Sequence, residues 1–145
     1  MTENRTYLTV LIPTFNRYDM LIDLLKRLEN EDRKKIRILI SDNCSEDIRY
    51  TDLKETCKQH PLNIQVFRHE EAITVNRNFE FLLSKVETEF SCYLADDDYW
   101  ELGALSKMVT IMVRDDIDFS YSESWFVHDS ITRKRIKKFH MHLLI

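Results

Sequence analysis

The sequence predicts an α/β fold with three layers, α/β/α, in which helices cover a mainly parallel sheet. Short apolar runs, typical of strands buried on both faces, alternate with segments whose apolar residues recur every three or four positions. This alternation favours right-handed crossovers between parallel strands. Polar clusters follow several of the runs, which places candidate ligand groups at one edge of the sheet. With 145 residues, the chain has the length of one domain.

The first part of the chain predicts a strand, a helix and a second strand. Residues 7–12 form a nearly continuous apolar run that Pro13 closes. In 18–28 the spacing of apolar residues indicates an amphipathic helix, and Asn16 is a candidate cap at its start. Residues 36–40 repeat the pattern of a buried strand and end in a polar cluster.

The middle of the chain continues the alternation. Apolar positions in 46–59 share one helical face, and Pro61 ends that helix. A strand is expected over 64–67 and a third helix over 75–86. Both crossovers are long enough to join parallel strands.

The last part begins with a strand over 90–95 that three consecutive aspartates stop. A fourth helix is expected over 102–112, followed by a fifth strand over 117–121. Further on, the pattern weakens, and we expect a hairpin in which 125–127 pairs with part of 131–139.

Composition excludes several classes of function. Gly103 is the only glycine, so the chain has no glycine-rich dinucleotide loop and no glycine-rich phosphate loop. The formal net charge of -4 argues against nucleic acid as the main partner. Three widely separated cysteines, Cys44, Cys57 and Cys92, predict free thiols in a reducing compartment. Because no apolar run has the length of a membrane span, a cytoplasmic protein is expected.

Three polar clusters follow expected strands, and they are the candidate functional residues. They are Pro13–Arg17, Asp42 with Asn43, and Asp96–Asp98. In a parallel sheet such positions meet at one edge, where ligands bind. Three adjacent carboxylates repel one another and call for a cation, and oxygen ligands select Mg²⁺ or Mn²⁺. The alternative is a solvated turn that caps the following helix.

Three segments together resemble a known family. VLIPTFNR (10–17), LISDNCSED (39–47) and VNRNFEFLLSKVETEFSCYLADDDYW (75–100) are similar to the nucleotide-sugar domain of family 2 glycosyltransferases, which have the GT-A fold. The similarity covers about residues 7–115. It implies metal-dependent, inverting transfer of a sugar from a nucleotide diphosphate to an acceptor in cell-surface polysaccharide or glycan synthesis. UDP-sugar is the preferred donor, and a glycan or lipid-linked molecule is the acceptor.

The resemblance also implies roles for individual residues around the nucleotide. Pro13, Thr14 and Phe15 would shape the base pocket, and Asp42 would accept a hydrogen bond from the base, most simply from a uracil imide. Asp47 would support the loop after the second strand or cap the following helix. Arg77 would reach the base or the diphosphate, and the alternative is an ordinary surface arginine.

The metal motif of the family is written D-x-D, and this chain departs from it because Ala95 stands where the first aspartate often lies. The resemblance therefore implies Asp97 as the metal ligand, Asp96 as the partner of the ribose hydroxyls and Asp98 as a supporting or alternative ligand. Mn²⁺ or Mg²⁺ bridging Asp97 and the phosphates would neutralise the departing diphosphate.

The remaining expectations concern what lies outside the donor site. The chain is expected to be a single nucleotide-sugar-binding domain, 1–145, truncated from a longer enzyme whose general base lies beyond residue 145. The alternative is a binding module without activity of its own. A basic cluster at 133–138 suggests peripheral membrane contact or a solvated hairpin face, and the apolar end 141–145 suggests self-association.

Overall fold

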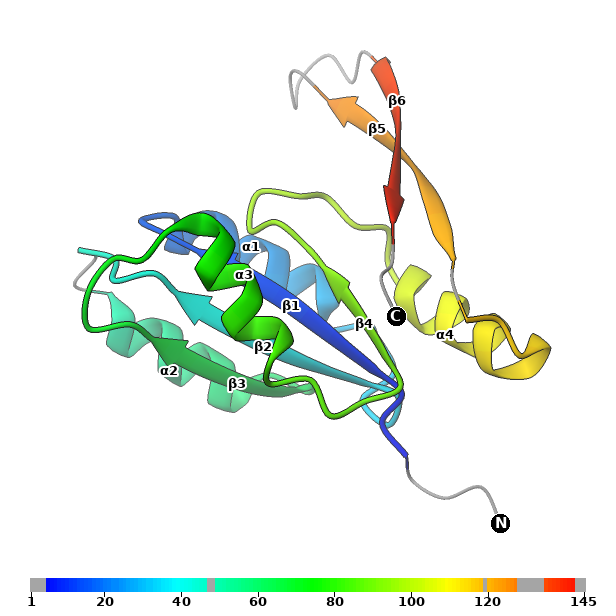
Figure 1. Cartoon of the computed structure of the whole chain (residues 1–145), viewed down its shortest axis with the longest axis horizontal. Coiled ribbons are helices and arrows are strands. Elements are labelled where there is room, and N and C mark those ends of the chain that lie inside the picture. The colour runs from blue at the N-terminus through cyan, green and yellow to red at the C-terminus, as the bar shows by residue number, and fades with distance from the viewer. Residues whose placement is uncertain (1–4, 47–48, 119, 128–134, 143–145) are drawn as a thin grey trace.

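The computed structural model describes residues 5–46, 49–118, 120–127 and 135–142. Four parallel strands form one sheet in the order β3-β2-β1-β4, and two further strands form a separate antiparallel hairpin. Figure 1 shows this hairpin beyond α4, apart from the larger sheet. The elements along the chain are β1 (Leu8–Thr14), α1 (Tyr18–Leu28), β2 (Ile36–Asp42), α2 (Tyr50–Gln59), β3 (Asn63–Arg68), α3 (Val75–Leu83), β4 (Phe90–Tyr93), α4 (Ala104–Asp115), β5 (Tyr121–Val127) and β6 (Arg135–His142).

Helices cover both faces of the four-stranded sheet, so the expected three-layer α/β/α architecture is confirmed (Figure 1). Successive side chains of a strand point to opposite faces. Val10 and Ile12 of β1 therefore belong to the larger core, which α1, α2 and α4 also line. Leu11 instead contacts Leu82 of α3 in a smaller cluster on the other face. Two hydrophobic cores thus hold the sheet in place.

The structure confirms the expected bounds of the first helix but corrects its expected cap. α1 spans Tyr18–Leu28 as the periodicity predicts, but Arg17 occupies the position before it and no side chain caps the helix there. Asn16 has a φ of 56°, in the left-handed region that asparagine tolerates. Its Oδ1 accepts a 2.8 Å hydrogen bond from the backbone N–H of Glu46. Asn16 therefore joins two loops instead of capping α1.

Pro13 lies inside β1 instead of closing it. The backbone of Leu11 faces β4, because its carbonyl accepts a hydrogen bond from the Leu94 N–H. The backbone nitrogen of Pro13, two residues later, points to the same side of β1. The pairing of β1 with β4 has already ended there, because its last pair is Leu11 with Tyr93. The missing N–H of proline therefore costs no ladder hydrogen bond.

The prediction of a fifth strand of the sheet over 117–121 is wrong. α4 ends at Asp115, and Asp116 adopts a left-handed conformation with a φ of 53°. The Ile117 N–H then bonds to the Met112 carbonyl at 2.9 Å, and the Ile117 side chain packs against the core. Residues that follow a left-handed position at the end of a helix often make such an apolar contact with the helix. The apolar character of Ile117 therefore reflects the end of α4 and not the start of a strand. β5 begins only at Tyr121 and pairs with β6.

The expected hairpin is present, with β5 and β6 antiparallel and Ser124 opposite Phe139. Its connection, 128–134, lies outside the described residues, and so do Arg133 and Lys134 of the basic cluster and 143–145 of the apolar end. All three cysteines are free thiols, as expected. Within the described ranges, no helix combines the length and apolar character needed to cross a membrane.

Glu31, a buried residue of the loop after α1, accepts hydrogen bonds from the start of α4. The Glu31 carboxylate accepts hydrogen bonds from the backbone N–H groups of Leu105 and Ser106, at 3.3 and 2.8 Å, and from the Ser106 hydroxyl. These amides belong to the first turn of α4, where N–H groups lack partners within the helix. Glu31 therefore caps α4 from a distant part of the chain, and its charge complements the helix dipole.

Candidate functional site

Polar residues end three neighbouring strands in register. Thr14 of β1 lies opposite Asp42 of β2, and Asp42 lies opposite Arg68 of β3. In each strand, every second residue points into the larger core, and these three residues continue that alternation. Their side chains therefore lie on the face of the sheet that α1 and α2 cover. The carboxyl ends of parallel strands are where α/β folds bind ligands. The row Thr14–Asp42–Arg68 therefore marks the candidate site.

Asp42 is fully buried and surrounded by hydrogen-bond donors. Its Oδ2 accepts a 2.7 Å hydrogen bond from the Tyr18 hydroxyl and lies 3.4 Å from Arg68 Nε. Its Oδ1 accepts hydrogen bonds from the backbone N–H, at 3.2 Å, and the hydroxyl of Ser45. A carboxylate offers about four acceptor positions, and three are filled by these hydrogen bonds, while the Arg68 guanidinium compensates the charge. A nucleobase reaching Asp42 would therefore compete with these donors for a buried carboxylate.

Two aromatic rings support this carboxylate. Burial raises the pKa of Tyr18, and its hydrogen bond to Asp42 raises it further, so the phenol remains a neutral donor. The Arg68 guanidinium lies 4.5 Å from the centre of the Tyr50 ring, and the rings of Tyr50 and Tyr18 are 6.4 Å apart. Arg68 thus reaches Asp42 across an aromatic surface that keeps it in place.

The loop after β2 is fixed by its own side chains, which bond to backbone groups of neighbouring loops. The Asn43 amide donates to the Ile73 carbonyl and accepts from the Ile73 N–H, both at 2.9 Å. Cys44 has a φ of 63°, which turns the chain sharply. Ser45 Oγ then accepts a 2.8 Å hydrogen bond from the Asn16 N–H. The loops after β1 and β2 therefore form one connected unit, and Asp47 lies outside the described residues.

The three aspartates lie on a tight turn that follows β4. The Asp98 N–H bonds to the Ala95 carbonyl, and Asp98 Oδ2 accepts from the Ala95 N–H, both at 3.1 Å. Asp96 is fully buried, and its Oδ2 accepts a 2.8 Å hydrogen bond from the Thr14 hydroxyl. The Asp97 side chain is 48% exposed. The turn therefore points one carboxylate inward to β1 and leaves the next one accessible.

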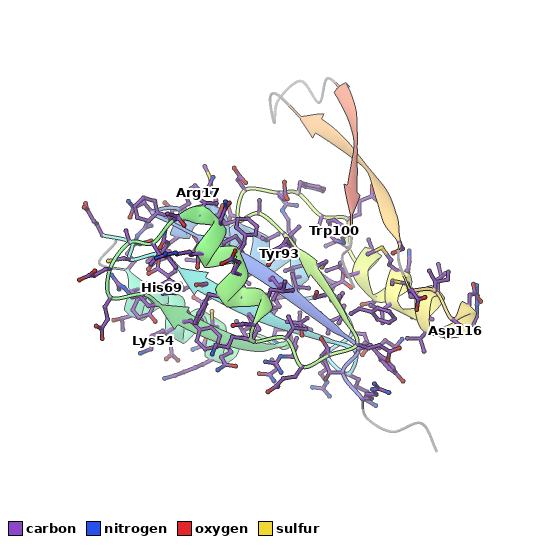
Figure 2. The ribbon with its side chains drawn as sticks, in the orientation of Figure 1. Arg17, Lys54, His69, Tyr93, Trp100 and Asp116 are labelled. Atoms are coloured by element: carbon purple, nitrogen blue, oxygen red, sulfur yellow. The ribbon has the colours of Figure 1, made fainter. Side chains whose placement is uncertain are left out.

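Arg17 lies against two of these carboxylates. Its Nη1 donates a 2.9 Å hydrogen bond to Asp97 Oδ2, and its Nη2 lies 2.8 Å from Asp96 Oδ1. The second contact is an ion pair by distance, but its geometry is not that of a hydrogen bond. Within the described part of the chain, Asp96 Oδ1 is a buried oxygen without a hydrogen-bond donor. Figure 2 labels Arg17 near the N-terminal end of α1.

Burial raises the pKa of Asp96, and the neighbouring Asp97 charge adds to this effect. The Thr14 hydroxyl and the Arg17 guanidinium act in the opposite direction. A buried carboxylate oxygen without a donor is rare in proteins and calls for an explanation, such as an ion or ligand. Trp100 Nε1, only four residues away, is also buried without a partner among the described residues. Segment 96–100 therefore has the polar atoms expected of a ligand site.

The donor set fits a divalent ion that is shared with a ligand. No group of three or more His, Cys, Asp or Glu side chains that would hold a metal is found among the described residues. Mg²⁺ in nucleotide sites commonly uses one or two carboxylates and completes its shell with water and phosphate oxygens. The exposed Asp97 carboxylate, next to Asp96 and Asp98 on the same turn, matches that smaller requirement.

The other residues expected at the site have different surroundings. Phe15 is 46% exposed directly after Thr14, and Pro13 is partly buried within β1. Arg77 is exposed in the first turn of α3, a helix capped by the Thr74 hydroxyl. Its neighbour Asn78 is buried instead, where its Oδ1 accepts a hydrogen bond from Ser41 Oγ and lies 3.1 Å from His69 Nε2. Asn78 therefore anchors α3 to the sheet.

The sequence placed Arg17 in the candidate cluster Pro13–Arg17 without a role of its own, and it indicated no role in the site for Tyr18, Ser45 or Arg68. All four contact an aspartate of the site. The signal for Arg68 is its place at the end of β3, on the same face as Ile64 and Val66. The strand-end rule that selected Asp42 applies equally to Arg68.

Comparisons with known proteins agree with this architecture. The chain is 30% identical over 102 residues to GalNAc(5)-diNAcBac-PP-undecaprenol beta-1,3-glucosyltransferase of Campylobacter jejuni, covering 70% of this chain and 33% of that protein. The crystal structure of S. aureus TarS 1-349 in complex with UDP matches with a TM-score of 0.69 at 22% identity, over 80% of this chain and 34% of that chain.

A second similar structure is the mannosyltransferase PcManGT from Pyrobaculum calidifontis in complex with GDP-Man and Mn²⁺. It matches with a TM-score of 0.61 at 20% identity, over 66% of this chain and 29% of that chain. The chain therefore spans about a third of the length of these relatives. The family model for glycosyl transferase family 2 matches residues 9–143. With a parallel sheet of this topology and a match over nearly its whole length, the chain belongs to glycosyl transferase family 2.

Proposed function

We propose that this chain binds the nucleotide-sugar donor of an inverting, metal-dependent glycosyltransferase that builds a cell-surface polysaccharide or glycan. The observation that carries this proposal is the turn after β4, where Asp96 has a buried oxygen without a hydrogen-bond donor beside the accessible Asp97. That turn lies where a doubly covered parallel sheet binds its ligands. The relatives support the proposal, since one is crystallised with UDP and another with GDP-Man and Mn²⁺.

The nucleoside would lie over the ends of β1 and β2. Phe15 offers an exposed ring for stacking on the base, beside Pro13 and Thr14. Asp42 would accept a hydrogen bond from the base, with UDP as the preferred nucleotide, once a present donor such as Ser45 gives way. Arg77, exposed at the start of α3, would provide a cation for the base or the diphosphate.

The diphosphate would lie beside the turn after β4. Asp97 would hold Mn²⁺ or Mg²⁺ together with phosphate oxygens, and Asp98 would support it. Asp96, held by the Thr14 hydroxyl, would accept hydrogen bonds from the ribose through Oδ1, which has no hydrogen-bond donor of its own. When bound, the metal supplies Lewis-acid neutralisation of the negative charge that develops on the leaving diphosphate.

The acceptor side of the reaction is proposed to lie outside the chain. A general base is needed to take the proton from the attacking acceptor hydroxyl, and we place it beyond residue 145. The acceptor is proposed to be lipid-linked or glycan, because the Campylobacter relative is named for a glycan carried on undecaprenol. In the alternative, the chain binds a nucleotide sugar but catalyses no transfer by itself.

Calorimetric titration of UDP, with and without Mn²⁺, tests the donor site. Wild type is expected to bind UDP with a dependence on Mn²⁺ that Asp97→Asn abolishes. Asp23→Asn removes the same charge from the exposed face of α1 and is the matched control, expected to bind as wild type does. Binding of GDP or dTDP in place of UDP would overturn the base assignment alone. Absence of binding by a chain that circular dichroism shows to be folded would overturn the donor site.

A further inference from the structure

We propose that Arg17 is a built-in competitor of the divalent ion, and that it leaves Asp96 and Asp97 when the ion and the diphosphate bind. The inference rests on the proposed function, because it assigns a regulatory role to a residue of that same site. Arg17 is the only residue in the described ranges whose cationic group contacts both of these carboxylates. It occupies the space where a shared metal ligand set would form.

The geometry shows why arginine and metal compete. The guanidinium is 2.8 Å from Asp96 Oδ1 and 2.9 Å from Asp97 Oδ2, so it bridges the buried carboxylate and the exposed one. A divalent ion that uses Asp97 would lie in direct contact with this guanidinium, and the two positive charges would repel each other. Each cation therefore weakens the binding of the other at these carboxylates.

The arginine contact is also incomplete on the buried side. Asp96 Oδ1 lies at ion-pair distance from Arg17 but receives no hydrogen bond from it. Thr14 holds only the other oxygen, Oδ2. The guanidinium thus compensates the charge of Asp96 without satisfying its hydrogen-bonding capacity, so ribose hydroxyls at Oδ1 and a cation at Asp97 together would replace what it supplies.

Arg17 can move without disturbing the fold. Its backbone carbonyl accepts the Leu21 N–H at 3.0 Å, which fixes its main chain at the start of α1. Its side chain is 44% exposed and has the rotatable bonds of a long arginine. Rotation of the side chain alone would free the guanidinium, whose planar set of N–H donors matches phosphate oxygens.

This exchange couples the two ligands. In the free chain, Arg17 weakens metal binding because the metal must displace it. A nucleotide diphosphate offers the displaced guanidinium a new anionic partner and offers the metal further oxygen ligands, so each ligand improves the binding of the other. The chain would consequently load metal and nucleotide together, and would bind little metal alone.

Electron paramagnetic resonance of free Mn²⁺ measures this competition without any catalytic readout. Arg17→Gln is expected to bind Mn²⁺ roughly five- to tenfold more tightly than wild type when no nucleotide is present. Arg33→Gln, an exposed arginine before β2 at the opposite end of the strands, removes the same charge and should leave Mn²⁺ affinity unchanged. The double variant Arg17→Gln/Asp97→Asn should lose the gain, which would place the bound Mn²⁺ at Asp97.

The nucleotide provides the second measurement. The factor by which UDP tightens Mn²⁺ binding is expected to be smaller in Arg17→Gln than in wild type. Unchanged or weaker Mn²⁺ affinity in a folded Arg17→Gln chain, while wild type still binds UDP with Mn²⁺, would overturn the exchange and leave the proposed function standing. If wild type showed no Mn²⁺-dependent binding of UDP, the proposed function would fail, and the exchange with it.

Discussion

The hydroxyl of Tyr18, the first residue of α1, donates a 2.7 Å hydrogen bond to Oδ2 of Asp42, the last residue of β2. Both residues are fully buried. The contact therefore ties the start of a helix to the end of a neighbouring strand at the edge where the site lies. It also replaces some of the hydration that a buried carboxylate loses.

Tyr18→Phe is expected to lower the free energy of unfolding by about 1–3 kcal/mol, because it leaves a buried carboxylate with one donor fewer. Urea denaturation measures the change. Tyr50→Phe, which keeps the ring beneath Arg68, is the matched control and should have a clearly smaller effect. Equal losses in the two variants would mean that the hydroxyl of Tyr18 has no special role.

Glu31→Ala is expected to destabilise the fold by roughly 1–2 kcal/mol, because it removes the acceptor for two amides in the first turn of α4. Chemical denaturation followed by circular dichroism reports this loss. Glu29→Ala changes an exposed glutamate two residues earlier and serves as the control. A stability for Glu31→Ala equal to that of the control would contradict the capping role.

Two buried thiols are expected to make the free energy of unfolding decrease as the pH becomes alkaline. Burial raises the pKa of Cys57 to about 11 and that of Cys92 to about 12. In the unfolded chain a thiol ionises near pH 8.5, at about its ordinary pKa. Because the folded pKa is the higher one, the contribution of the neutral thiol is fully present below about pH 8.5 and is lost as pH rises toward 11.

The free energy of unfolding should therefore fall between about pH 8.5 and 9.5, before most tyrosines ionise. Cys57→Ala should reduce the steepness of this fall. Cys44→Ala, which changes a partly exposed thiol, should leave the slope as it is in wild type. Identical slopes in all three proteins would show that burial of Cys57 does not control the pH dependence.

Arg77→Ala is expected to weaken UDP binding in the presence of Mn²⁺ by about tenfold, the loss of one charge-assisted contact. The melting temperature should not change, because the Arg77 side chain is exposed. Lys85→Ala removes the same charge from the exposed region just after the other end of α3. If both variants bound UDP equally well, Arg77 would be an ordinary surface arginine.

Much of the fold follows from local patterns in the sequence. The apolar period in 18–28 predicts the bounds of α1 because that pattern continues along the whole buried face of the helix. The strands of the sheet are predictable because their apolar runs are too short and too continuously apolar to form surface helices. Ile117 shows the limit of such patterns, since an apolar residue that closes a helix and one that begins a strand look alike in sequence.

The candidate site was predictable in position but not in its internal contacts. Strand ends place Thr14, Asp42 and Asp96 at one edge of the sheet, and the structure joins Thr14 to Asp96. The partners of these residues were not predictable, because Arg17 and Arg68 resemble ordinary exposed cations in sequence. Their roles depend on which carboxylates lie opposite them, and only the three-dimensional arrangement decides that.

The in-register row of Thr14, Asp42 and Arg68 constrains how this chain can change length. Removing one residue from within β2 would shift Asp42 by about 3.3 Å along the strand and turn it toward the α3 face, away from Tyr18. Insertions between α1 and β2 would leave the row intact. Variation in length should therefore be confined to connections at the amino-terminal edge, while the spacing within each strand stays fixed.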